Sequence, residues 1–167
     1  MANALTDPPF AADPPVKLNV NAKILGLVIG IIAIIGAILS LIGLLAAFGA
    51  CTILGQTIGG CGVPILWLLG AVIQVVAYIL GAVGGFRMYQ LNREGKNNVV
   101  YGLALGFLGT IVYLIGNIIF YAGISVIGAG YGGAIVGVII DLIIIFIFYY
   151  LVVISRFPGE APLVPSA

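Results

Sequence analysis

Four long runs of apolar residues dominate the pattern of hydrophobic and polar positions along this chain. They extend roughly over residues 24–48, 63–86, 99–124 and 134–154. Each run reaches the length of about 20 residues that a helix needs to cross the hydrocarbon core of a bilayer. None of them alternates apolar and polar residues, as the strands of a membrane barrel do. The pattern therefore predicts an all-α integral membrane protein with four spans.

The spans leave little of the chain outside the membrane. We expect residues 1–23 to form a Pro-rich tail, residues 24–154 a four-span transmembrane bundle, and residues 155–167 a second Pro-rich tail. Both tails should be extended, because proline disrupts regular helices and strands. The tails are either solvated or lie along a partner protein, and the sequence leaves both possibilities open.

Charged residues are few and unevenly placed. They make up 7% of the chain, whereas soluble domains carry about 25%. The basic residues fall before the first span, between the second and third, and after the fourth. Because basic residues mark cytoplasmic segments, and an even number of spans brings both ends to one side, we expect both termini in the cytoplasm. The membrane should be a plasma membrane or a bacterial inner membrane. The six basic residues are Lys17, Lys23, Arg87, Arg93, Lys96 and Arg156.

The connection between the second and third spans, residues 87–98, is short and polar. Gly95 and the pair Asn97 and Asn98 predict a turn there between two antiparallel helices. The connection is too small to form a domain of its own.

Small residues recur at steps of three and four along every span. This spacing keeps one face of a helix toward a neighbouring helix, and small residues allow helix backbones to approach closely in a membrane. The stripes predict a compact antiparallel four-helix bundle whose bulky residues face lipid or neighbouring subunits. The glycines expected at helix contacts are Gly36, Gly43, Gly70, Gly81, Gly106, Gly109 and Gly137.

Asp141 is the one ionisable residue well inside a span. A charge near the bilayer centre costs about 2.5–3.5 kcal/mol on insertion scales, so this carboxyl should face the bundle interior and have a partner or a proton. Counted at ~1.5 Å per residue, Ser40, Gln74 and Asn117 lie at a similar depth in the outer half of the membrane. We therefore hypothesise a polar layer of these four residues. The layer either fixes the register of the helices or carries protons or cations.

Cys51 and Cys61 are the only cysteines, and both fall in the expected outer loop near residues 49–62. In an oxidising compartment they would form a disulfide worth ~2–3 kcal/mol in the chain-entropy model. The alternative is two free thiols. A metal site is not expected, because this loop supplies no His, Asp or Glu ligand.

The residues that most enzymes and pigment-binding proteins need are missing from this chain. It has no histidine, and its net charge of +1 is spread thinly, so we expect no catalytic residue, cofactor or nucleic-acid partner. By elimination we expect a non-catalytic accessory or scaffold subunit of a larger membrane complex, respiratory, photosynthetic or similar. It would contact lipid and other membrane subunits through its bulky helix faces and extended tails.

Two alternatives to a subunit stay open. One is a small transporter or channel, formed by several copies of the chain, that uses Asp141 as an intramembrane proton or cation carrier. The other is a stand-alone four-span protein that organises the membrane through its outer loop.

Overall fold

Four long helices account for most of the described chain. The computed structural model describes residues 5–58, 65–123 and 129–160. Within these residues the helices follow one short 3-10 turn near the N-terminus. The elements are η1 (Pro9–Ala11), α1 (Ala22–Ile58), α2 (Ile65–Tyr89), α3 (Glu94–Gly123) and α4 (Ala129–Ile154).

Each long helix contains a stretch that is long and apolar enough to cross a membrane. The prediction of an all-helical chain with four such helices is therefore confirmed. The stretches are Ala22–Leu45, Leu66–Tyr89, Glu94–Ile118 and Ile135–Ile154.

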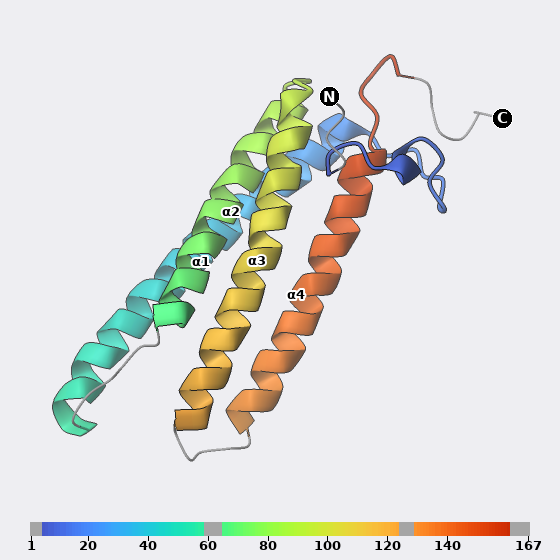
Figure 1. The fold of residues 1–167 in the computed structure, drawn as a ribbon. Coiled ribbons are helices and arrows are strands. Elements are labelled where there is room, and N and C mark those ends of the chain that lie inside the picture. Colours follow the sequence, from blue (N-terminus) through green and yellow to red (C-terminus); the bar gives the residue numbers. More distant parts are fainter. Residues whose placement is uncertain (1–4, 59–64, 124–128, 161–167) are drawn as a thin grey trace.

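The helices form an open arrangement rather than a bundle closed on all sides. Consecutive helices run antiparallel, and the first and last described residues, Leu5 and Glu160, lie at the same end of the helices, here called the tail end (Figure 1). The α2–α3 interface is the largest, followed by α1–α2 and then α3–α4, whereas α1 and α4 share only a small contact. The far end of α1 diverges from α3 and α4 (Figure 1). The compact bundle expected from the small-residue stripes is thus open on the side between α1 and α4.

Helix α1 continues beyond Phe48, where the first span was expected to end, as far as Ile58. Residues 49–58 contain neither proline nor charge, so no strong helix-breaking signal interrupts them. Cys51 therefore lies on a helix instead of in a loop. Cys61 lies outside the described residues, and the disulfide stays a prediction.

Asparagine side chains begin two of the helices. The Oδ1 atom of Asn21 accepts a hydrogen bond of 2.9 Å from the backbone N–H of Lys23 at the start of α1. The Oδ1 atom of Asn92 accepts one of 2.9 Å from the backbone N–H of Glu94 at the start of α3. Both bonds satisfy amide groups that have no partner inside the helix.

The turn between α2 and α3 comes a few residues before the expected position. It occupies residues 90–93, with Leu91 in the left-handed conformation at a φ of 64°. Gly95 already belongs to α3. A Cβ atom at this position would lie 2.5 Å from the backbone nitrogen of Met88. Gly95 is thus needed for the close approach of the two helices, and the turn does not require it.

Glycines bring α2 into backbone contact with both of its neighbours. A Cβ atom added to Gly85 would lie 2.5 Å from the backbone nitrogen of Gly30 in α1. One added to Gly70 would lie 2.6 Å from the backbone nitrogen of Tyr113 in α3. Since backbone atoms cannot move aside as a flexible side chain can, these positions fix the distance between the helices.

The other glycines expected at helix contacts differ in how closely they are packed. Gly36, Gly81 and Gly109 also face a neighbouring helix, where an added Cβ would lie 2.6 to 3.3 Å from the nearest atom. Gly106 has more room, and an added Cβ there would be 3.8 Å from its nearest neighbours. For Gly43 and Gly137 no described atom lies within 4 Å.

The hydrophobic core is concentrated at the tail end, where all four helices meet. Met88, Val99, Val100 and Ile154 are fully buried there. The ammonium group of Lys96 donates a hydrogen bond of 2.6 Å to the carbonyl of Val153 in the last turn of α4. A cation is favourable at this position, because the unpaired carbonyls of a helix C-terminus carry partial negative charge.

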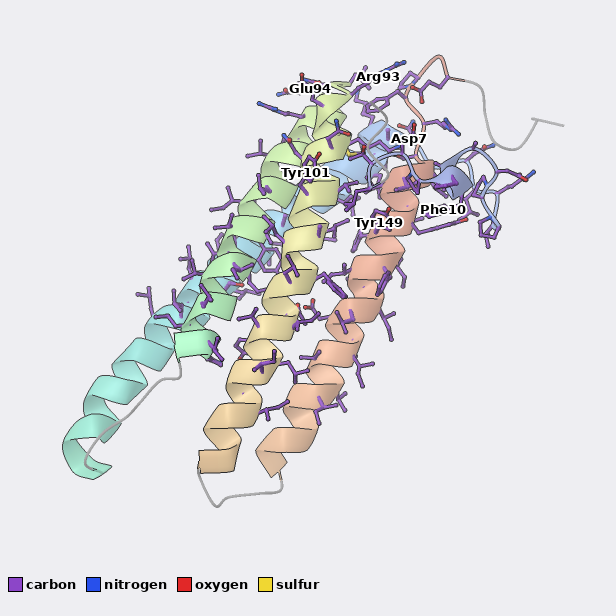
Figure 2. The ribbon with its side chains drawn as sticks, viewed as in Figure 1. Asp7, Phe10, Arg93, Glu94, Tyr101 and Tyr149 are labelled. Carbon is purple, nitrogen blue, oxygen red and sulfur yellow. The ribbon has the colours of Figure 1, made fainter. Side chains whose placement is uncertain are left out.

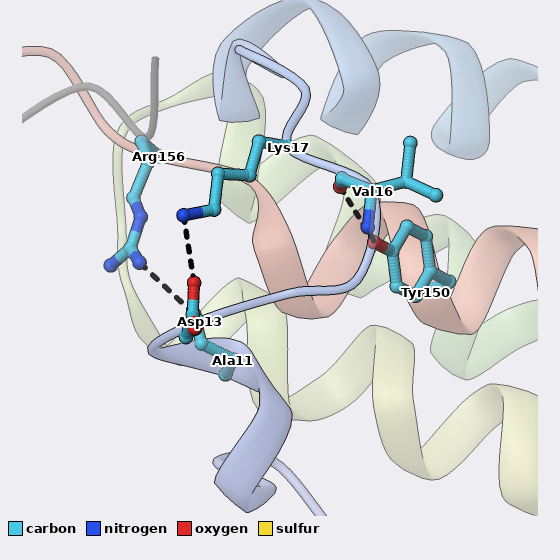
Figure 3. A network of polar contacts seen from close by, with 6 residues as sticks. All are labelled: Ala11, Asp13, Val16, Lys17, Tyr150 and Arg156. Carbon is cyan, nitrogen blue, oxygen red and sulfur yellow. Dashed lines mark hydrogen bonds and ion pairs between the residues drawn. The ribbon is translucent and has the colours of Figure 1, made fainter. Parts of the chain in front are cut away.

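The N-terminal segment of residues 5–21, here called the strap, lies across the tail end of α4 (Figures 1 and 3). The hydroxyl of Tyr150 donates to the carbonyl of Val16 (2.7 Å) and accepts from its N–H (3.1 Å). The hydroxyl of Tyr149 donates to the carbonyl of Leu5 at 2.9 Å. The ring of Phe10 stacks on that of Tyr150, with centroids 6.1 Å apart. The described part of this tail is thus held by its own chain, unlike either expected arrangement.

The strap also pairs with the segment that follows α4. The N–H of Arg156 donates to the carbonyl of Val20, and the N–H of Ala22 donates to the carbonyl of Arg156, each at 2.9 Å. These bonds form an isolated parallel bridge between Asn21 and Arg156. The guanidinium of Arg156 donates a further bond of 3.1 Å to the carbonyl of Ala11 (Figure 3).

All six basic residues lie at the tail end and contact another group of the chain; Figure 2 shows Arg93 and Glu94 there. Lys17 and Asp13 form an ion pair of 2.8 Å, and the hydrogen bond from Lys17 lowers the pKa of the Asp13 carboxyl (Figure 3). This pair is exposed and contributes little to stability. The remaining contacts are Lys23 with the Tyr89 ring, Arg87 with Glu94, Arg93 with Glu160, Lys96 with Val153 and Arg156 with Ala11.

We predict that Gly85→Ala destabilises the fold by about 1–3 kcal/mol, the usual cost of overpacking. The added methyl group would force α1 away from α2 at Gly30. The matched control is Gly43→Ala, which introduces the same methyl group on a helix where no described atom lies within 4 Å. Unfolding in mixed micelles measures both variants. Equal stability of the two would contradict the role of Gly85 in packing.

We predict that Tyr150→Phe releases the strap, because the change removes both hydrogen bonds to Val16. Amide hydrogen exchange of residues 5–16 should accelerate several-fold, while exchange in α2 stays unchanged. Tyr113→Phe, on the far half of α3, is the control and should leave the strap protected. Unchanged exchange in Tyr150→Phe would show that the strap is held by other contacts.

Candidate functional site within the spans

Three polar side chains from three helices form a continuous hydrogen-bonded chain, here called the polar chain. The Nε2 atom of Gln74 in α2 donates to the Oγ1 atom of Thr110 in α3 at 2.6 Å. The hydroxyl of Thr110 donates in turn to the Oδ2 atom of Asp141 in α4 at 2.5 Å. Gln74 also donates to the carbonyl of Gly106 at 3.2 Å. The polar chain therefore ties α2, α3 and α4 together inside the apolar stretches.

The direction of these bonds determines what the site can bind. Gln74 uses its amide nitrogen twice as a donor, so its carbonyl oxygen, Oε1, remains an acceptor. Thr110 engages one oxygen of the Asp141 carboxyl, which leaves Oδ1 as a second acceptor. Asp141 is half-buried, whereas Thr110 is only 3% exposed. The site thus presents acceptor oxygens and keeps its donors occupied.

The structure brings together two of the four residues expected in the polar layer, Gln74 and Asp141. Asn117 is 7% exposed, but its side-chain amide donates to the carbonyl of Tyr113 on its own helix at 2.8 Å. Ser40 is half-buried on α1, and in the described part of the chain it makes no hydrogen bond to the other three. The divergence of α1 explains its separation from the polar chain.

Thr110, the residue that joins Gln74 to Asp141, was not anticipated. A signal for it does exist in the sequence, because Thr110 lies one helical turn after Gly106 on the face of α3 that packs on α2. Threonine is a weak signal in a span, since its hydroxyl can bond to a carbonyl of its own helix.

A cavity of about 110 Å³ adjoins the polar chain between the four helices, and we call it the central cavity. Asp141 and Gln74 line it at one end, next to Gly106, and Tyr78 is a third lining residue with a polar group. Beyond them the walls are apolar and many of the residues are small. Side chains or backbone of all four helices contribute, including Ala33, Ala77, Gly81, Gly102 and Phe148.

The described residues contain no group of three or more His, Cys, Asp or Glu side chains that would hold a metal ion. The polar chain is accordingly the main concentration of polar side chains within the described spans. No protein-family model, curated protein or solved structure matches the chain. The interpretation of the site therefore rests on its geometry.

We predict that Thr110→Val weakens the fold by roughly 0.6–1.7 kcal/mol, the range measured for hydrogen bonds between membrane helices. The change keeps the shape of the side chain and removes the link between Gln74 and Asp141. Thr110→Ser keeps the hydroxyl and should retain most of the link. A double-mutant cycle with Asp141→Ala, which removes the acceptor oxygens, is measured by unfolding in mixed micelles and isolates the coupling. A coupling energy near zero would show that the polar chain does not stabilise the helix packing.

Proposed function

We propose that this chain is a non-catalytic accessory or scaffold subunit of a larger membrane protein complex. The observation that carries the proposal is the open side between α1 and α4. There the two helices share only a small contact, and no described atom lies within 4 Å of Gly43 or Gly137. Helices in lipid associate where small residues allow close approach, so these glycines suit contact with a further helix.

The surroundings of the open side support this proposal. Leu39 and Ile42 on α1 are 62% and 57% exposed, and Val136 and Ile140 on α4 are 57% and 52% exposed. Asp141 is half-buried and lies on the same helix as Gly137. Lipid cannot satisfy a carboxyl group, and intramembrane carboxyls normally face protein or a water-filled cavity. A helix of another subunit against α1 and α4 would cover both the glycines and the carboxyl.

The strap removes the N-terminal tail from the docking surfaces that we propose. Extended tails were one of the two expected docking surfaces, but residues 5–21 are held against α4 by Tyr149 and Tyr150. Docking is therefore assigned to the helix faces. Because all six basic residues lie at the tail end, we place this end in the cytoplasm of a plasma membrane or bacterial inner membrane.

A second candidate function is a small oligomeric carrier of protons or cations. The polar chain favours it, since Asp141 is an intramembrane carboxyl beside a cavity. In this case Asp141→Asn would abolish activity, whereas an accessory subunit would tolerate the change.

We predict that the chain, extracted from its native membrane in mild detergent, migrates on native gels as a large band with defined partner proteins. A photoreactive amino acid at Gly137 should crosslink to a partner, because no described atom of the chain itself lies within 4 Å of a Cβ atom at that position. The same probe at Val76, which is 44% exposed on α2, is the control and should label mainly lipid. A small homo-oligomer with no other protein would contradict the subunit proposal and favour the carrier.

A further inference from the structure

The central cavity has the features of a binding site for a small organic cation. We propose that it binds a primary ammonium compound with a short alkyl chain of about four carbons. The ammonium group would lie against Asp141 and Gln74, and the alkyl chain would lie along the apolar walls. This inference concerns a ligand of the single chain and does not depend on the subunit role.

The polar end of the cavity fits an ammonium group. Oδ1 of Asp141 and Oε1 of Gln74 are acceptors, because the donors of the polar chain are already engaged. An ammonium group has three N–H donors and no acceptor, so it complements this arrangement. Its positive charge would also compensate a carboxylate that has no basic residue nearby, since all six Lys and Arg lie at the tail end.

The remainder of the cavity fits a short alkyl chain. From Gly106 the lining follows α3 to Gly102 and Val99, a distance of roughly 10 Å at ~1.5 Å per residue. Isoleucine, leucine, valine and phenylalanine side chains, with alanine, glycine and the ring of Tyr78, form the walls. The volume of about 110 Å³ is smaller than the engineered cavity of ~150 Å³ that binds benzene in another protein. The space therefore suits a chain of a few carbons and excludes bulky amphiphiles.

Other ligand classes fit this cavity less well. A calcium ion requires six to eight oxygen ligands, and magnesium requires an octahedral shell, whereas the lining residues with polar side chains are Asp141, Gln74 and Tyr78. An anion would be repelled by the carboxylate. A neutral alkane would leave both acceptors without a donor, which is costly in an apolar site. An organic cation satisfies the acceptors and the apolar walls together.

The cavity is accessible from the membrane. Asp141 is half-buried, and α1 and α4, which each contribute to the lining, share only a small contact. Alkylammonium compounds concentrate at the bilayer interface, since one end is polar and the other apolar. Such a ligand can therefore reach Asp141 between the two helices without local unfolding.

The test is equilibrium binding of radiolabelled n-butylammonium to the full chain in nanodiscs of zwitterionic lipid, with empty nanodiscs subtracted. We expect saturable binding that n-butanol does not compete away. Aspartate labelled with ¹³C at the carboxyl locates the ligand, because the chain has only three aspartates. The signal of Asp141 should shift on titration, whereas those of Asp7 and Asp13 should not.

Two variants test the two halves of the site separately. Asp141→Asn removes the charge and should weaken binding at least tenfold. Gly106→Leu keeps Asp141 but fills the cavity, because an added Cβ has its nearest neighbours at 3.8 Å and the longer side chain projects onward; it should also weaken binding at least tenfold. Gly43→Leu is the matched control, placed where no described atom lies within 4 Å, and should bind as the unmodified chain does.

Three results would overturn the proposal. One is the absence of saturable binding of n-butylammonium to the unmodified chain. Another is competition by n-butanol that is as strong as competition by unlabelled n-butylammonium. The third is unchanged affinity in Gly106→Leu, which would place the ligand outside the cavity. None of these results bears on co-purification with partner subunits, so the two proposals succeed or fail separately.

Discussion

Backbone contact between helices at glycine is the constraint on which the rest of this structure depends. Lipid tails are as apolar as leucine side chains, so hydrophobic burial gives little reason for two spans to associate, and close packing must supply it. Helix α2 meets this requirement on both sides, at Gly85 against α1 and at Gly70 against α3. These contacts place α2 between α1 and α3. They also set the slant of α1, which is tightly packed on α2 at Gly30, whereas no described atom lies within 4 Å of Gly43.

Helix α4 is held in a different way. At the tail end it is fixed by the buried core, by the hydrogen bond from Lys96 to Val153, and by the strap. Nearer its middle it is fixed by the bond from Thr110 to Asp141. Between these two attachments the side chains of α4 leave space against the other three helices, and this space is the central cavity. Attachment at two separated places therefore explains why a cavity persists beside a carboxyl group.

Features of this structure that depend on neighbouring residues could be predicted from the sequence. Features that depend on how the helices pack could not. Apolar length is a local property, so the four spanning helices were predictable. Depth along a helix placed Gln74 near Asp141, but it also selected Asn117, which bonds to its own helix instead. Spacing put Gly43 on a contact stripe, yet spacing does not show where two helices diverge. Tyr150 holds the strap through two hydrogen bonds, but a tyrosine near the end of a span is common as an interfacial anchor, so the sequence does not indicate this contact.

The open side and the central cavity are physically coupled. Helices α1 and α4, which share only a small contact, each carry a glycine, Gly43 and Gly137, with no described atom within 4 Å, and Asp141 on α4 is only half-buried. A partner helix seated there would close the path by which a ligand enters from the membrane. A ligand already bound would then be trapped, and an empty site would be protected from ligand. Such coupling is reciprocal. If a cation in the cavity contacts or repels the partner helix, it changes the affinity for that helix. The partner helix then changes the affinity for the cation by the same factor.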